Sequence, residues 1–468
     1  MKTTTRSPLP AWLGVALLAA TFVHAAAPTT AQPAPAWLTQ PLSLAECLNL
    51  ALEQSSAVLK SKQDLEAAHG VVVQTRAIVI PKLRVTGDYS ITDQEAIDQI
   101  PLPATLPGGL GDFASISYPD QHWSTTIRLV QSIYEGGRLQ SALRTAKLTR
   151  EQALAQHQTV IADTLLDVRL AFYDILLAAQ QIVVQEASVK LLERELKDQT
   201  HRYDAGTVPR FNVLRAEVEV ANARPRLIRA RNAHRITKNN LVNVLGYNLP
   251  KEVREDIPLT LAGALQAEPY EIELPAAVAK AQEHRTELSA LRKAADLRKE
   301  AIVNAKAGSL PSAQVFVGWG ARNSSFSEDL TRDVSGWQAG ALLTWDPFDG
   351  LLTRGKVEEA RARYERAKED VTDVTRRIEL EVRSAYSNFI EAREVLESQK
   401  KVKEQAEEAL RLATARSEAG TGTQLDVLSA QTALTEARTT EIQALHAYAV
   451  ARARLERAMG EGLPTTAK

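Results

Sequence analysis

The segment HWSTTIRLVQSIYEGGR (residues 122–138) joins two kinds of secondary structure and decides how the chain folds. Its first nine residues alternate in side-chain polarity, and a period of two predicts a β-strand whose apolar face holds Trp123, Thr125, Ile127 and Leu129. A Gly-Gly pair then breaks the pattern. The following 65 residues (202 − 138 + 1) contain neither proline nor glycine. At about 1.5 Å per residue they predict a helix of roughly 100 Å.

The long segment also carries a regular apolar spacing. Its apolar residues recur in steps of four and three, and a seven-residue repeat of this kind predicts a left-handed coiled coil. The stripe consists of Ile161, Leu165, Val168, Phe172, Ile175, Ala179 and Ile182, and a second one consists of Ile378, Val382, Ala385, Phe389, Ala392 and Leu396.

The second half of the chain repeats the first. An offset of 214 residues (337 − 123) relates Trp123 to Trp337 and holds without a gap as far as Leu241 and Leu455. Upstream of the tryptophans the offset becomes 230 (311 − 81), so the first copy has 16 extra residues (230 − 214). Residues 91–121 are rich in Pro, Gly and Asp, and we expect this insertion to be an exposed loop.

Each long helical segment is predicted to reach a glycine-containing turn and to return. The turns are YDAGTVP (203–209) and SEAGTGT (417–423). Glycine after the last helical residue ends a helix, and we expect Thr207 and Thr423 to cap the helices that follow. The returning helices should end near Gly246 and Gly460, and helical pieces over 42–80 and 274–310 should precede the strands.

Four segments have the two-residue period of strands, in two hairpins about 200 residues apart. Their length suits tilted membrane strands of about 9–11 residues. A small soluble sandwich is the alternative, but no other strand-rich segment could cover the apolar faces. Four strands cannot close a barrel, whereas three copies would supply 3 × 4 = 12 strands. The aromatic residues predicted at the lipid interface are Tyr89, Trp123, Trp319, Trp337 and Trp345.

Composition and the N-terminus indicate export. The 56 Lys and Arg nearly balance the 57 Asp and Glu, which argues against a nucleic-acid partner. Residues 1–25 have the basic start, short apolar run and small residues of a cleaved signal peptide. No cysteine lies directly after that run, so we do not expect a lipoprotein. The single cysteine, Cys47, is expected to be a buried, inert core residue.

These elements, duplicated and in this order, resemble the TolC or outer membrane factor family. The resemblance covers about residues 42–460, and its most specific parts are AGTGTQLDVL (419–428) and the equivalent turn from Ala205 to Leu214. YEGG (134–137) and PFDG (347–350) resemble the family's strand-to-helix junctions. The resemblance implies a homotrimer whose 12-stranded outer membrane barrel continues as a periplasmic α-helical tunnel. It also implies a periplasmic adaptor and an inner-membrane transporter as partners.

The resemblance further implies roles for residues at the helical tips. Asp426 would contribute one carboxylate per copy to a ring at the periplasmic entrance, although stabilisation of a helix N-terminus explains an acid there equally well. The other residues implied at this gate are Ser429, Gly422 and Asn212. The adaptor-docking tips would comprise Gly206, Thr207, Pro209, Gly420, Thr421, Thr423 and Leu425.

The predicted fold is mainly α-helical with a membrane β-barrel. The sequence does not identify the solutes that would pass through it. Catalysis is not expected, because no nucleophile–base arrangement, phosphate loop or metal-ligand spacing is visible and no cofactor is implied. A periplasmic coiled-coil scaffold without a pore is the alternative function, and efflux and type I secretion both fit the channel. The predicted boundaries are a signal peptide (1–25), a linker (26–41), a first repeat (42–250; hairpins about 82–130 and 138–246), a linker (251–273), a second repeat (274–460; hairpins about 312–345 and 351–460) and a tail (461–468).

Overall fold

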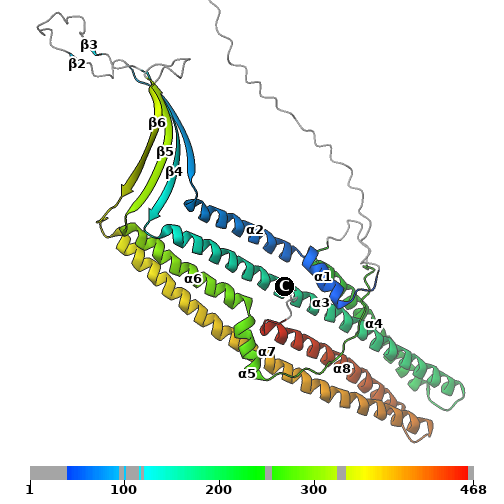
Figure 1. Ribbon diagram of the computed structural model, residues 1–468. Coiled ribbons are helices and arrows are strands. Elements are labelled where there is room, and N and C mark those ends of the chain that lie inside the picture. The colour runs from blue at the N-terminus through cyan, green and yellow to red at the C-terminus, as the bar shows by residue number, and fades with distance from the viewer. Residues whose placement is uncertain are drawn as a thin grey trace, which may run out of the picture.

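The computed structural model describes residues 40–93, 100–101, 115–116, 121–247, 256–323 and 334–461. The predicted signal peptide, nearly all of the N-terminal linker, most of the 91–121 loop, part of the 251–273 linker and the tail after Glu461 lie outside these residues. The described chain is elongated, with a curved sheet at one end and two helical tips at the other (Figure 1).

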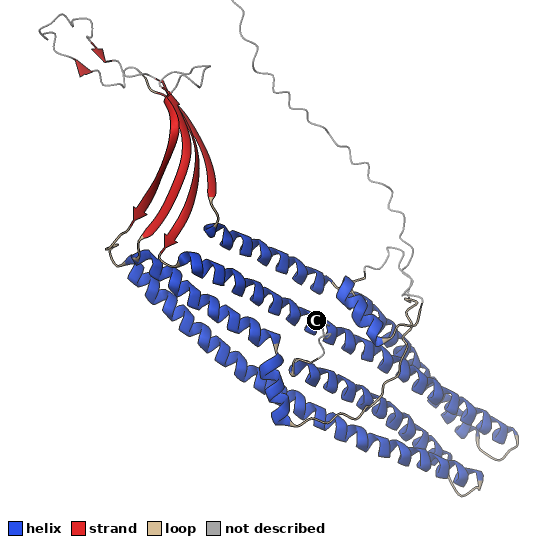
Figure 2. Ribbon diagram, viewed as in Figure 1, coloured by secondary structure: helices blue, strands red, loops and turns tan. Residues whose placement is uncertain are grey.

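The first half of the chain contains α1 (Leu44–Gln54), α2 (Ser56–Arg76), the 3-10 turn η2 (Ala77–Val79), β1 (Lys82–Ile91), β4 (Gln121–Glu135), α3 (Arg138–Asp204) and α4 (Arg210–Val244). The second half has the same order: α5 (Leu274–His284), α6 (Thr286–Lys306), η4 (Ala307–Ser309), β5 (Ser312–Asn323), β6 (Val334–Thr344), α7 (Leu352–Glu418) and α8 (Gln424–Ala458). Figure 2 shows the segregation of helices from strands.

Two short strands were not predicted. The segment between β1 and β4, expected to be a loop, contains β2 (Ile100–Pro101) and β3 (Ser115–Ile116), which pair with each other in a separate two-stranded sheet. β4 is also longer than its alternating pattern suggested, because a register shift between Ser132 and Tyr134 lets pairing with β5 continue to Glu135.

The main sheet is antiparallel with the strand order β1-β4-β5-β6. The contact between β4 and β5 brings the two repeats together, while β1 and β6 form the two edges. Within the described residues neither edge has a further strand partner, so each edge presents unpaired backbone N–H and C=O groups.

Each repeat has its own helical core. In the first, Val168, Phe172 and Ile175 of the predicted stripe pack with Leu241 and Cys47. Burial raises the pKa of the Cys47 thiol to about 11, which agrees with an inert core cysteine. The equivalent core of the second repeat contains Ile378, Val382, Phe389, Ala392, Leu396, Tyr448 and Leu455. The stripes therefore lie largely within the cores, although Ile161, Ala179 and Ile182 of the first stripe are only partly buried. No helix in the described part of the chain is both long and apolar enough to cross a membrane.

The returning helices end where glycine was expected to end them. Gly246 and Gly460 have φ of +80° and +77°, a region that favours glycine. At Gly246 an added Cβ would lie 2.3 Å from the carbonyl oxygen of Gln54, and at Gly460 it would lie 2.8 Å from the carbonyl carbon of His284. Each glycine thus allows a long helix to end against the break between two short helices.

Candidate functional site

The two helical tips share one backbone geometry. After α3, Thr207 N–H donates to the carbonyl of Arg202 (2.9 Å) and Gly206 N–H to that of Tyr203 (2.8 Å). After α7, Thr421 and Gly420 make the equivalent bonds at 2.9 and 3.2 Å, and both glycines have φ of +72°. This is the Schellman arrangement, which satisfies the last carbonyl groups of a helix. The sequence YDAGT and its repeat SEAGT therefore fold in the same way.

The two turns lead into their next helices differently. Thr423 caps α8 with its side chain, as expected. Thr207 does not cap α4. Its hydroxyl bonds the carbonyl of Arg202 at the end of α3 (2.8 Å), and Pro209 occupies the capping position of α4 without a side-chain bond. The prediction for Thr207 was wrong because Thr207 lies two residues before the capping position. Its hydroxyl therefore bonds the end of the preceding helix, as the hydroxyl of its repeat counterpart Thr421 does with the carbonyl of Arg416.

Asp426 forms a capping box at the start of α8. Its Oδ2 accepts bonds from the N–H of Thr423 (3.0 Å) and from the Thr423 hydroxyl (2.8 Å), and its own N–H donates to that hydroxyl oxygen (3.3 Å). The Thr423 N–H, followed by the hydroxyl, holds the pKa of Asp426 below its ordinary value. The side chain therefore stays ionised at neutral pH and has a structural task within one copy.

One hydrogen bond links the two tips. The side-chain Nε2 of Gln424, at the start of α8, donates to the backbone carbonyl of Asn212 in α4 (3.1 Å). Gly422 lies just before this helix start, where an added Cβ would lie 2.9 Å from the Cβ of Arg416. The structure thus brings Asn212 and Gly422 to the same region as Asp426, while Ser429 is exposed one turn further along α8.

The residues predicted to dock an adaptor lie on the surface of the tips. Gly206 and Gly420 have open space around them, and Leu425 exposes 48% of its surface. The exposed members of this set are Gly206, Thr207, Pro209, Gly420, Thr421, Thr423 and Leu425. The tips therefore expose backbone and a few side chains.

At the other end of the molecule, the sheet has one uncharged face. The register aligns Val85 with Ile127, Ile127 with Trp319 and Trp319 with Trp337. The neighbouring row on this face is Leu83, Leu129, Val317 and Ala339. Among the described strand residues none on this face is charged, and several of them are exposed despite being apolar. The described chain leaves much of this face exposed, although Trp123 and Ala321 near its loop end are buried.

The predicted interface aromatics lie at more than one height along the strands. Tyr89 pairs with Trp123 near the loop end, and Trp319 pairs with Trp337 four residues further along. Trp345 follows β6 at the helix end, where its indole N–H donates to the carbonyl of Ser309 (3.2 Å). Trp337 is 80% exposed, but Trp123 is only 7% exposed and is covered within the chain.

A network of ion pairs between helices was not predicted from the sequence. We call it the arginine clasp, and it consists of Arg285, Arg457 and the carboxylates they bind. Arg457 of α8 pairs with Asp163 of α3 (2.6 Å) and with Glu287 of α6. Arg285, between α5 and α6, pairs with Glu381 of α7 (2.8 Å) and donates to the carbonyls of Arg457 and Ala458 at 3.4 and 3.3 Å. The clasp therefore joins four helices.

The two arginines of the clasp occur only in the second repeat. By the offsets of 230 and 214 residues, Ser55 and Asn243 occupy the positions of Arg285 and Arg457. Both arginines are almost buried, so their charges need the paired carboxylates. Only a comparison of the two repeats could have indicated these arginines, because the first repeat has Ser55 and Asn243 at their positions.

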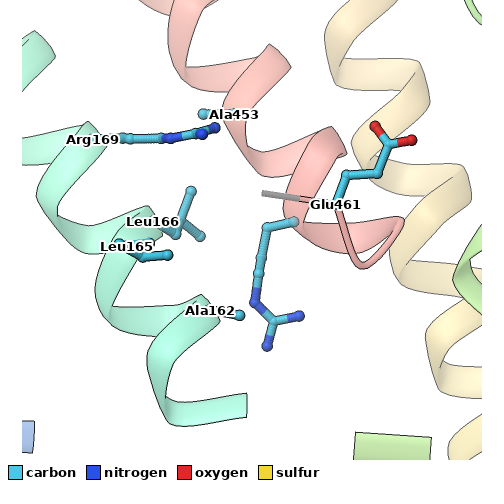
Figure 3. Close-up of a pocket in the computed structure, with 7 residues that line it drawn as sticks. Ala162, Leu165, Leu166, Arg169, Ala453 and Glu461 are labelled. Atoms are coloured by element: carbon cyan, nitrogen blue, oxygen red, sulfur yellow. The ribbon is translucent and has the colours of Figure 1, made fainter. Parts of the chain in front are cut away.

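Beside the clasp, α3 and α8 enclose a small cavity of ≈ 10 Å³, room for about one water molecule. Arg169 extends from α3 toward α8 near Ala453 (Figure 3) and pairs with Glu456 at 2.8 Å. The cavity is too small for a solute, so it supports packing at the interface rather than substrate binding.

Comparisons with known proteins identify relatives over most of the chain. The sequence profile described as outer membrane efflux protein matches residues 47–247 and 277–461. The outer membrane protein TolC of Escherichia coli is 23% identical over 437 residues, which are 90% of this chain and 83% of that protein. The alkaline protease secretion protein AprF of Pseudomonas aeruginosa is 24% identical, covering 88% and 83%. The crystal structure of the outer membrane protein VceC of Vibrio cholerae has a TM-score of 0.72 at 17% identity, covering 90% and 97%.

Proposed function

Because the chain belongs to the outer membrane efflux protein family and is an outer membrane export channel, we propose that three copies form one continuous duct. The uncharged exposed face of the sheet is the observation that supports this. An apolar sheet face of this kind needs lipid or protein to cover it, and open edges are not tolerated in lipid. Three four-stranded sheets joined at their edges satisfy both requirements.

The aromatic residues suit such a barrel. Trp345 lies eight residues beyond Trp337 (345 − 337), or roughly 27 Å along the strand. Tyr89, which is 52% exposed, lies about another 13 Å away. With strands tilted by about 40°, these aromatic levels are roughly 20–30 Å apart, which is comparable with an apolar band of about 25 Å. A periplasmic scaffold without a pore would have no use for such a band.

The helices would continue the barrel into the periplasm, with the tips as the gated entrance. The bond from Gln424 to Asn212 holds the second tip against the first within a copy, so opening would have to break it. We place a periplasmic adaptor on the exposed tips and an inner-membrane transporter beyond it, as in the tripartite systems that the family resemblance implies. The chain would be a passive duct without catalysis, exported by its signal peptide.

Reconstitution tests the duct and its entrance together. The purified chain should be a detergent-dependent trimer, and it should give ion channels in planar bilayers. Mg²⁺ added on the tip side should reduce the current, and Asp426→Asn should weaken this block at least several-fold, because a ring of carboxylates is lost while the amide oxygen can still cap α8. A detergent-free monomer would contradict the duct. Unchanged Mg²⁺ block in the variant would contradict the carboxylate ring alone.

Gly420→Val tests the adaptor surface. Valine at φ of +72° distorts the turn at a cost of about 1–2 kcal/mol, but the open space around Gly420 avoids a clash. We expect trimers to form and adaptor crosslinking in cells to be lost. Gly355→Val is the matched control, since Gly355 in α7 also has open space but an ordinary φ and lies far from the tips. If both variants crosslink to the adaptor equally, the adaptor does not dock on this surface.

A further inference from the structure

The face of the sheet opposite the uncharged one carries an excess of positive charge. Four cations and two carboxylates share it, giving 4 − 2 = +2 per copy. Asp88 accepts a bond from the hydroxyl of Ser124, and Glu135 lies beyond the register shift at the helix end. The cations are Lys82, Arg84, Arg128 and Arg322.

Two of these cations lie side by side without a counter-ion. Arg84 is the direct register partner of Arg128, and like charges in directly opposed positions destabilise a sheet. Within the described residues neither arginine has an ion pair. The Nε of Arg128 is buried and lacks any hydrogen-bond partner, which is costly for a charged donor. The missing partner at this point is an anion.

The surroundings hold the guanidinium of Arg128 in place. Its Cζ lies 4.8 Å from the centroid of the Phe316 ring, a cation–π contact that fixes the plane of the donor fork. Gly340 leaves room for that ring, because an added Cβ would lie 2.9 Å from its Cζ. Gly318, the β5 partner of Arg128, places no side chain beside the fork. Within the described residues, the guanidinium is therefore held in a fixed orientation while its Nε has no acceptor.

We infer that Arg84 and Arg128 form an oxyanion-binding ring in the wall of the barrel, which favours solutes bearing carboxylate or phosphate groups. This rests on the proposed trimer, in which the uncharged face meets lipid and the arginine face lines the lumen. Twelve strands spaced by about 4.8 Å and tilted by about 40° give a radius of roughly 12 Å. Six arginines (3 × 2) at one level would then act within about one Debye length, roughly 10 Å at 0.1 M salt.

The test uses full-length trimers in bilayers of zwitterionic lipid. Pyrophosphate added on the loop side of the sheet should reduce the wild-type current. Arg84→Gln/Arg128→Gln should require at least about tenfold more pyrophosphate, and its reversal potential in a KCl gradient should move toward cations. Both differences should shrink in 1 M salt, where the Debye length is about 3 Å. Arg84→Lys/Arg128→Lys keeps the charge but not the fork, so it should retain the reversal potential and lose part of the pyrophosphate block.

The outcomes separate this inference from the proposed function. Wild-type channels with the same reversal potential and block as the glutamine variant would overturn the oxyanion ring and leave the duct intact. A wild-type chain that gives no channels would overturn the duct, and the ring with it. A difference that appears only when anionic lipid is added would assign the phosphate to a headgroup and overturn the assignment to a passing solute.

Discussion

Gly246→Ala is expected to lower the unfolding temperature far more than Gly206→Ala, although both glycines have positive φ. At Gly206 the added methyl group meets nothing within 4 Å, so the cost is the left-handed backbone alone, about 1 kcal/mol. At Gly246 it would also lie 2.3 Å from the carbonyl oxygen of Gln54 and 2.9 Å from the Cα of Ser55. These backbone atoms cannot move aside as the end of a flexible side chain would.

We therefore expect Gly246→Ala to cost roughly 3–5 kcal/mol, the sum of the conformational and overpacking terms. Circular dichroism of thermal unfolding in detergent would measure it, with Gly206→Ala as the matched control. Gly460→Ala provides a second comparison, because its methyl group would meet the backbone of His284 at the equivalent position of the second repeat. Equal losses at Gly206 and Gly246 would show that backbone conformation alone matters and that the helix ends are not closely packed.

Arg457→Gln is expected to lower the free energy of unfolding by roughly 2–3 kcal/mol, because it leaves the half-buried Glu287 without its main partner. Arg438→Gln on the same helix is the control. Arg438 pairs with Glu407 at 2.9 Å, but both side chains are more than a third exposed, so that loss should stay within about 1 kcal/mol. Denaturant titration of detergent-solubilised protein at several pH values would measure both.

The pH dependence identifies the clasp as the cause. Burial would raise the pKa of Glu287, but the hydrogen bond and charge of Arg457 outweigh it and the pKa is lowered. A carboxyl with a lowered pKa in the folded state adds stability above its unfolded pKa and loses it as pH falls through the folded value. Without Arg457 the pKa of Glu287 rises. The difference in free energy of unfolding between wild type and variant should therefore shrink toward acidic pH. A difference in free energy of unfolding that is the same at every pH would show that Arg457 stabilises the fold by packing alone.

The sequence predicted the periodic parts of this fold and missed those that depend on contacts between distant segments. The stripe around Val168 and Phe172 and the alternation around Trp123 could be recognised because one buried face imposes a fixed period on the residues. Gly246 and Gly460 marked helix ends because few other residues adopt their backbone. The short strands β2 and β3 gave no such signal, since two-residue strands have no measurable period.

The candidate sites divide in the same way. The turns at Gly206 and Gly420 were predicted because their hydrogen bonds are local in sequence. The bond from Gln424 to Asn212 spans 212 residues, and nothing near Gln424 indicates its partner, although Asn212 was placed at the gate through the family resemblance. The arginine clasp was missed because its ion pairs connect helices from both repeats. The adjacent arginines Arg84 and Arg128 were missed because their pairing depends on the register between β1 and β4.

The open edges of the sheet have a consequence for how the channel is made. If strands β1 and β6 find partners only in neighbouring copies, a newly exported subunit cannot complete its own fold before it meets two others. Folding and association then become a single step whose yield rises steeply with subunit supply. A copy with a damaged edge would be incorporated beside sound ones and would spoil the whole assembly, so a minority of defective chains could silence most of the channels in a cell.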